Sequence, residues 1–282
     1  MFDIGANLTH RALRPGYRDL LNAATATGVN DISITAAHPD NTRLALAMIE
    51  AADSQVVLTT TTGLHPHLAA QYTPAMGQRM RSYAAHPAVA AIGETGLDYF
   101  RMLASVSEQQ QSFRAQLDLA CELNMPVFLH QRDAHSDFVA ILRDYRPHLC
   151  KVVVHCFTDS RAALEDYLAL NCYIGITGWI CDIKRGAILR QLVADIPDDS
   201  LLLETDAPYL LPPEALQNNW TDPQLVQLSQ RYGRNNLPHY LPLVLRQVAV
   251  CREQQTAHLA QLTTANARAF FGGRHLCHER AQ

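Results

Sequence analysis

The chain has 282 residues, of which 48% are hydrophobic and 18% charged, and a formal net charge of −4 at pH 7. This composition supplies a large core and excludes a disordered chain, and the acidic balance argues against a protein that coats nucleic acid through many Lys and Arg contacts. Residues 1–10 lack a secretory signal pattern, and no stretch approaches the roughly 20 apolar residues of a membrane span. We therefore expect a cytoplasmic protein without membrane partners.

Eight short runs of β-forming residues alternate with segments of helical periodicity along the chain. The runs cover residues 2–8, 29–36, 56–63, 89–93, 126–130, 151–155, 172–177 and 201–204. Several are continuously apolar, which is typical of strands buried on both faces, and the alternation predicts a parallel α/β fold. Eight units in a chain of this length favour a closed (β/α)₈ TIM barrel, for which roughly 250 residues is typical. An open, doubly wound sheet is the alternative.

The pattern changes after the eighth run. Prolines stand at positions 208, 212 and 213, and a long polar excursion covers residues 214–237. Two amphipathic helices, over 241–251 and 256–271, are expected to close the barrel. The prediction is one domain over residues 1–272, followed by a flexible tail over 273–282. The role of the loop 212–237 stays open, although loops of this length are usually functional or mobile.

Four of the predicted strands end on side chains of the kind that bind metal ions: Glu94, His130, His155 and Asp206. Functional groups of α/β barrels sit at the carboxyl ends of the strands, so we expect these four to face one pocket and hold a divalent ion. Imidazole suits Zn²⁺ or Mn²⁺ and carboxylates accept Mg²⁺ or Mn²⁺, so the mixed set does not choose the metal. Each residue alone has a simpler explanation; Asp206, which precedes Ala-Pro, could be a helix N-cap.

Other residues near the same strand ends are candidates for substrate binding: Asn7, His65, His67, Arg132 and Trp179. Arg132 could clamp a phosphate through its planar guanidinium, with a salt bridge to a nearby aspartate as the alternative. Trp179 and Phe157 could stack on bases, which holds single strands without sequence preference, or they could pack within the barrel. For His65 and His67 the alternative is a turn in which one imidazole bonds to the backbone.

Seven segments, in order from residue 3 to about residue 211, carry a family resemblance: DIGANL, GLHPH, AIGETGLDY, MPVFLHQRDAH, VVHCFT, YIGITGW and LLLETDAPYL. Their combination resembles the TatD family of metal-dependent deoxyribonucleases, whose barrels are amidohydrolase-like. The resemblance implies a 3′-to-5′ exonuclease that acts on single-stranded DNA and also RNA, with Mg²⁺ as the usual metal. It assigns metal ligation to Glu94, His130 and His155. Asp206 matches the family's strand-eight aspartate, and His65 matches a histidine of the substrate pocket.

The implied chemistry is in-line hydrolysis of a phosphodiester by a metal-activated water. Asp206 would orient or deprotonate that water, which makes Asp206, Glu94 and His65 the candidate catalytic residues. Many relatives have histidines where Gly5 and Asn7 stand, so one or two metals remain open. The alternatives are a metal-dependent amidohydrolase, lactonase or deaminase, and a non-catalytic protein-binding barrel. We expect a monomer.

Overall fold

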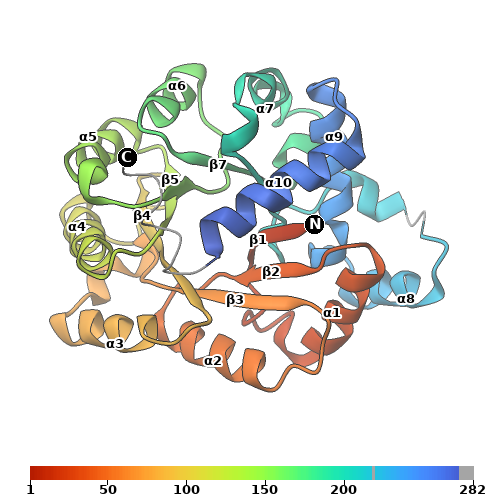
Figure 1. The fold of residues 1–282 in the computed structure, drawn as a ribbon, viewed down its shortest axis with the longest axis horizontal. Coiled ribbons are helices and arrows are strands. Elements are labelled where there is room, and N and C mark those ends of the chain that lie inside the picture. The colour runs from red at the N-terminus through yellow and green to blue at the C-terminus, as the bar shows by residue number, and fades with distance from the viewer. Residues whose placement is uncertain (218–219, 273–282) are drawn as a thin grey trace.

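The protein forms an eight-stranded parallel barrel in a computed structural model, which describes residues 1–217 and 220–272. The predicted tail therefore lies outside the described residues. The sheet follows chain order through β1 (Phe2–Ala6), β2 (Asp31–Ile34), β3 (Val57–Thr62), β4 (Val89–Asp98), β5 (Val127–Arg132), β6 (Val152–Val154), β7 (Tyr173–Ile176) and β8 (Leu201–Leu203). Figure 1 shows these strands at the centre of the molecule with helices around them. The predicted (β/α)₈ barrel is confirmed.

The sheet closes where β8 meets β1. Ala6 forms a parallel bridge with Ala207, and the backbone N–H of Asp206 donates to the carbonyl of Gly5 at 2.8 Å. Asp3, a buried residue of β1, accepts hydrogen bonds from the N–H and the hydroxyl of Thr205, just beyond β8. These bonds join the first and last strands, so the open-sheet alternative does not hold.

Helices follow the strands and cover the outside of the barrel. They are α1 (Tyr17–Ala26), α2 (Pro39–Glu50), α3 (Pro74–Ala84), α4 (Val106–Leu123), α5 (His135–Tyr145), α6 (Arg161–Ala169), α7 (Ala187–Leu192), α8 (Pro223–Tyr232), α9 (Leu241–Cys251) and α10 (Thr256–Phe271). Helix α10 closes the amino-terminal end of the strands, where Phe271 stacks on Phe2 with ring centroids 5.3 Å apart. The two predicted closing helices are confirmed. Within residues 1–217 and 220–272, no helix has the length and apolarity needed to cross a bilayer.

The segment predicted as a long polar loop is partly helical. A 3₁₀ helix covers Pro213–Gln217, and α8 begins after Asp222, whose side chain accepts a hydrogen bond from the N–H of Gln224. Leu225, Leu228 and Tyr232 are buried along one face of α8, at the three- and four-residue spacing of an amphipathic helix. The prediction of one continuous loop was wrong because this short apolar pattern lies among polar residues.

Strand β4 is longer than predicted, and its length shapes the site. Residues 89–93 were expected, but the strand continues to Asp98 through Gly93 and Gly96, with φ values of 143° and 146°. Its pairing with β5 shifts register between Ile92 and Thr95. Glycine adopts these φ values without a steric penalty. One strand therefore carries both Glu94 and Asp98 into the end of the barrel.

Candidate metal centre

The carboxyl ends of the strands open into a cleft of about 710 Å³. Its lining includes all nine residues proposed as metal ligands or as candidates for substrate binding: Asn7, His65, His67, Glu94, His130, Arg132, His155, Trp179 and Asp206. They come from segments spread over some 200 residues of sequence. The barrel brings them together because parallel strands end at the same edge.

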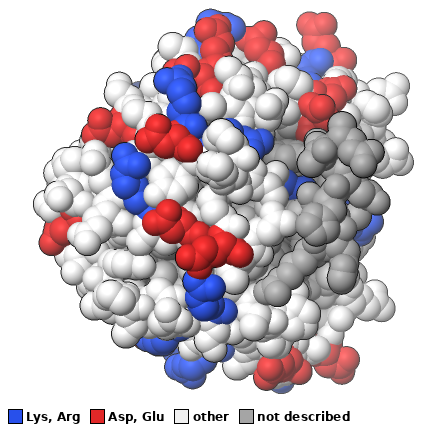
Figure 2. Space-filling view, turned by 60° about the vertical axis from the view of Figure 1, so that its left-hand side comes forward, with Lys and Arg blue, Asp and Glu red and all other residues white. Residues whose placement is uncertain are grey.

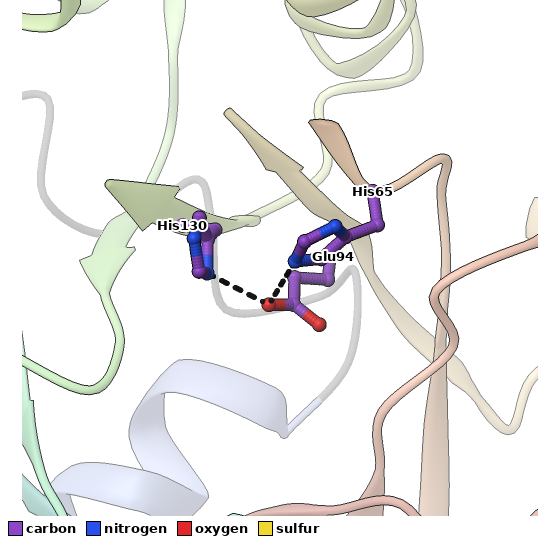
Figure 3. Close-up of side chains that lie close together, drawn as sticks. All are labelled: His65, Glu94 and His130. Atoms are coloured by element: carbon purple, nitrogen blue, oxygen red, sulfur yellow. Dashed lines mark hydrogen bonds and ion pairs between the residues drawn. The ribbon is translucent and has the colours of Figure 1, made fainter. Parts of the chain in front are cut away.

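Glu94 lies at the centre of the polar cluster. Its Oε1 is 2.8 Å from His155 Nε2, 3.1 Å from His130 Nδ1 and 3.3 Å from His65 Nε2. Figure 3 shows His65, from the loop after β3, and His130, from β5, both pointing at the Glu94 carboxylate on β4. Burial opposes ionisation, but the nearby imidazoles, His65 and His155 foremost, outweigh it and hold the pKa of Glu94 well below its usual value.

Two further carboxylates lie behind the imidazoles. His155 Nδ1 is 3.4 Å from Glu204 Oε2, and His130 Nε2 is 3.3 Å from Asp98 Oδ2. A ring whose N–H is given to an outer carboxylate points the lone pair of its other nitrogen inward, which is the usual orientation of a histidine metal ligand. Glu204 and Asp98 were not among the predicted site residues. Their position at or just beyond the ends of β8 and β4 was the available signal.

His65 has a different environment. Its Nδ1 accepts a hydrogen bond from the backbone N–H of His67 at 3.1 Å, so the turn alternative is present in the structure. A neutral imidazole that accepts at Nδ1 carries its proton on Nε2, and this nitrogen therefore faces Glu94 as a donor. Although the ligand atoms of His65, Glu94 and His130 lie within 4.8 Å of one another, this tautomer suits His65 to donate a hydrogen bond. His67 Nε2 lies 2.7 Å from Asp98 Oδ2.

Asp206 reaches the cleft beyond the end of β8. Its Oδ1 accepts a hydrogen bond from Asn7 Nδ2 at 3.1 Å, and no helix begins behind it, so the N-cap alternative is wrong. Burial, with Glu94 and Glu204 nearby, raises the pKa of Asp206 to about 8 against the opposing effect of His155. A carboxyl group in these surroundings is one whose charge a bound cation would stabilise.

The donor set fits a divalent cation. The ion pairs of Glu94, Asp98 and Glu204 are all with imidazoles, and none of the described Lys or Arg side chains pairs with them. Buried carboxylates without a fixed positive partner are costly unless a cation or protons neutralise them. Mixed imidazole and carboxylate donors suit Mn²⁺ or Zn²⁺ and accept Mg²⁺.

The residues proposed to hold the substrate differ in their environments. Arg132 places its guanidinium 3.7 Å from the ring centroid of Phe100, and no salt bridge joins it to an aspartate in the described part of the chain. Trp179 is half-buried, and the guanidinium of Arg185 lies 4.4 Å from its ring centroid. Phe157 is only 2% exposed and packs in the core, so the suggestion that it stacks on bases was wrong.

A closed parallel barrel with imidazoles and carboxylates at the carboxyl ends of its strands has its polar cluster where the enzymes of the TIM-barrel class have their active sites. Within that class the chain belongs to the family described as TatD related DNase, which matches residues 2–272. The resemblance inferred from the sequence motifs is confirmed.

Named relatives match almost the whole chain. The protein called 3′-5′ ssDNA/RNA exonuclease TatD from Musicola paradisiaca (strain Ech703) is 42% identical over 271 residues, which cover 96% of this chain and 97% of the relative. The protein of the same name from Klebsiella pneumoniae (strain 342) is 41% identical over 96% of this chain and 98% of the relative.

Solved structures share the fold. YJJV, a TatD homologue from Escherichia coli K12, superposes with a TM-score of 0.82 at 26% identity, over 97% of this chain and 98% of its own. A phosphotriesterase from Mycobacterium tuberculosis superposes with a TM-score of 0.60 at 16% identity, over 96% of this chain and 93% of its own. The second likeness concerns the fold alone, because one barrel supports many reactions.

Proposed function

We propose that this protein is a divalent-metal-dependent 3′-to-5′ exonuclease that hydrolyses phosphodiester bonds in single-stranded DNA and RNA. The observation that carries the proposal is the convergence of three imidazoles on Glu94 in a cleft that Arg101, Arg132 and Arg185 also line. Arginine is the side chain best suited to bind phosphate oxygens in pairs. The names of the relatives that align over 96% of the chain support the same activity.

In this proposal Glu94, His130, His155 and Asp206 hold the metal, with Mg²⁺ as the physiological ion. A divalent ion bound there would lower the pKa of a water and neutralise charge on the phosphoryl oxygens. Glu204 and Asp98 keep the rings of His155 and His130 in the tautomers that leave a lone pair pointing inward. The stoichiometry of a metal titration distinguishes one bound ion from two.

The chain's own groups then position the substrate and move the proton. Asp206, oriented by Asn7, takes a proton from the attacking water, since a carboxylate next to a cation is ionised and can act as a base. The Nε2–H of His65, which faces Glu94 Oε1 at 3.3 Å, transfers its hydrogen bond to a phosphoryl oxygen when the substrate is bound. We further propose that Arg132, His67 and Trp179 hold the end of the strand, and that a monomer suffices because one chain supplies every residue named.

The test uses protein stripped with a chelator and oligonucleotides labelled at either end, with Mg²⁺ or Mn²⁺ restored in a titration. We expect products that shorten from the 3′ end, in the presence of metal only, and none from the Glu94→Ala variant. Glu165→Ala is the matched control, because Glu165 is exposed on α6 and outside the cleft. No cleavage with either metal would reject the nuclease and direct attention to amide and lactone substrates.

A further inference from the structure

The loop between β4 and α4, residues 99–105, presents apolar side chains beside the cleft. Phe100, Met102 and Leu103 are 53%, 47% and 65% exposed. Leu103 and the neighbouring Arg101 are part of the cleft lining. Large apolar side chains gathered on one exposed loop next to a cleft are typical of a binding surface.

The loop holds these side chains outward in a defined position. Oδ1 of Asp98 accepts hydrogen bonds from the N–H groups of Phe100 and Arg101 at 3.0 and 2.8 Å. The buried side chain of Gln109 donates from Nε2 to the carbonyls of Asp98 and Ala104, both at 3.0 Å. These hydrogen bonds fix both ends of the loop and hold Phe100 in its exposed position.

The same aspartate connects the loop to the candidate metal centre. While Oδ1 of Asp98 fixes the loop, Oδ2 lies 2.7 Å from His67 Nε2 and 3.3 Å from His130 Nε2. The guanidinium of Arg132, which lines the cleft, lies 3.7 Å from the Phe100 ring centroid. The guanidinium therefore covers one face of the ring, and the exposed part of Phe100 lies at the edge of the cleft.

We propose that Phe100, covered on one face by the Arg132 guanidinium, offers its other face as a stacking site for an unpaired nucleobase of the strand whose terminal phosphate occupies the cleft. This inference rests on the proposed function and names how that site selects its substrate. An aromatic ring stacks on each of the bases, so the contact does not depend on the sequence of the strand. An arginine adds a cation–π contribution. A base within a duplex has no free face to offer, so the site selects single strands.

The test measures binding, so that it does not depend on cleavage. The first probe is a 5′-labelled oligothymidylate with phosphorothioate linkages at its 3′ end. The second probe is the same oligonucleotide with abasic residues at the last two 3′ positions. Fluorescence anisotropy in Mg²⁺ gives Kd for each. We expect Phe100→Ala to weaken binding of the thymidylate about tenfold and binding of the abasic oligonucleotide less than about twofold. Phe100→Trp should keep the wild-type affinity.

Val250→Ala is the control for loss of an exposed apolar side chain, because Val250 is 72% exposed on α9 and does not line the cleft. It should bind both probes as the wild type does. The inference is overturned if Phe100→Ala keeps the wild-type Kd, if it weakens both probes equally, or if the wild type does not bind the thymidylate. A different outcome is also possible: Phe100→Ala weakens binding of the thymidylate alone, but no metal cleaves an unmodified oligonucleotide. That result would reject the proposed exonuclease and support the stacking site.

Discussion

At the scale of single residues, the carboxylate behind His155 is central to the candidate site. Glu204 is fully buried, lies 3.4 Å from His155 Nδ1 and also accepts the backbone N–H of Cys156 at 2.5 Å. It therefore holds the ring in one orientation without lining the cleft itself. Its effect on a bound metal should operate through the imidazole.

We expect Glu204→Gln to weaken metal binding about 10- to 100-fold, because the amide no longer favours a proton on Nδ1 of His155. Isothermal titration of the stripped protein with Mn²⁺ measures the change, and circular dichroism checks that the fold is retained. Glu165→Gln, on the exposed face of α6, is the control and should bind as the wild type does. Unchanged affinity in Glu204→Gln would show that His155 needs no orienting partner or is not a ligand.

The burial of His239 predicts that the stability of the protein depends on pH. The residue is fully buried beside Trp220 and Tyr240, neither ring nitrogen has a hydrogen-bond partner within the described residues, and burial lowers its pKa to about 4. The unfolded chain, with a pKa near 6.5, binds the proton more readily. The contribution of neutral His239 to the free energy of unfolding should therefore be fully present above about pH 6.5. The free energy of unfolding should decrease by up to about 3 kcal/mol as the pH falls to about 4, because the unfolded chain takes up the proton first.

Urea unfolding at pH 7.5 and pH 5 measures this loss. The His239→Phe variant should lose less stability than the wild type between the two pH values, because phenylalanine cannot take up a proton. The exposed His148 gives a control, and His148→Gln should follow the wild type. An equal loss in His239→Phe would assign the pH dependence to other groups.

At the scale of elements, β4 depends on glycine at the point where it passes the site. At Gly96, φ is 146°, and a Cβ would collide with the backbone carbonyl oxygen of His130. At Gly233, φ is 58°, and a Cβ would meet no atom within 4 Å. The two positions separate the cost of backbone conformation from the cost of a collision between strands.

We expect Gly96→Ala to lower the free energy of unfolding by more than about 3 kcal/mol, because strand β5 must move to admit the methyl group. Gly233→Ala should cost less, about 1 to 2 kcal/mol, the penalty of a positive-φ backbone conformation (φ 58°, ψ −111°) alone. Urea denaturation of both variants measures the difference. Similar losses would mean that β4 and β5 separate easily, and the precise spacing of Glu94 and His130 would then need another explanation.

At the scale of the whole molecule, charge limits how nucleic acid can be held. The chain carries a net charge of −4, and on the face shown in Figure 2 the Lys and Arg residues are interspersed with Asp and Glu. The three arginines that line the cleft are Arg101, Arg132 and Arg185. A single strand held by the proposed site should therefore meet about three cationic side chains.

The salt dependence of oligonucleotide binding tests this count. With about 0.7 counterions released for each phosphate contacted, log Kobs should fall with log[salt] at a slope of about −2. Anisotropy over a series of KCl concentrations gives the slope, and Arg185→Gln should reduce its magnitude by about 0.7. A slope steeper than about −5 would indicate a binding surface much wider than the cleft.

Much of this architecture could be predicted because its signals are local. Apolar runs of strand length, alternating with helical patterns, predicted the barrel. Because parallel strands end at one edge, residues such as Glu94, His130 and His155 could be expected to meet there before any distance was known. The limits of β4 and the helix α8 were missed, since glycine conformation and a short apolar face depend on what packs against them.

The sequence by itself determined the fold class, the family and nine of the side chains that share the cleft, since strand order and strand ends are encoded in short-range patterns. Only the tertiary structure decided which nitrogen of each imidazole meets which carboxylate, that Glu204 and Asp98 orient the rings, and that Arg132 lies on Phe100. These contacts join residues as much as 61 positions apart. Their geometry depends on register, side-chain rotamers and burial, which no local pattern specifies.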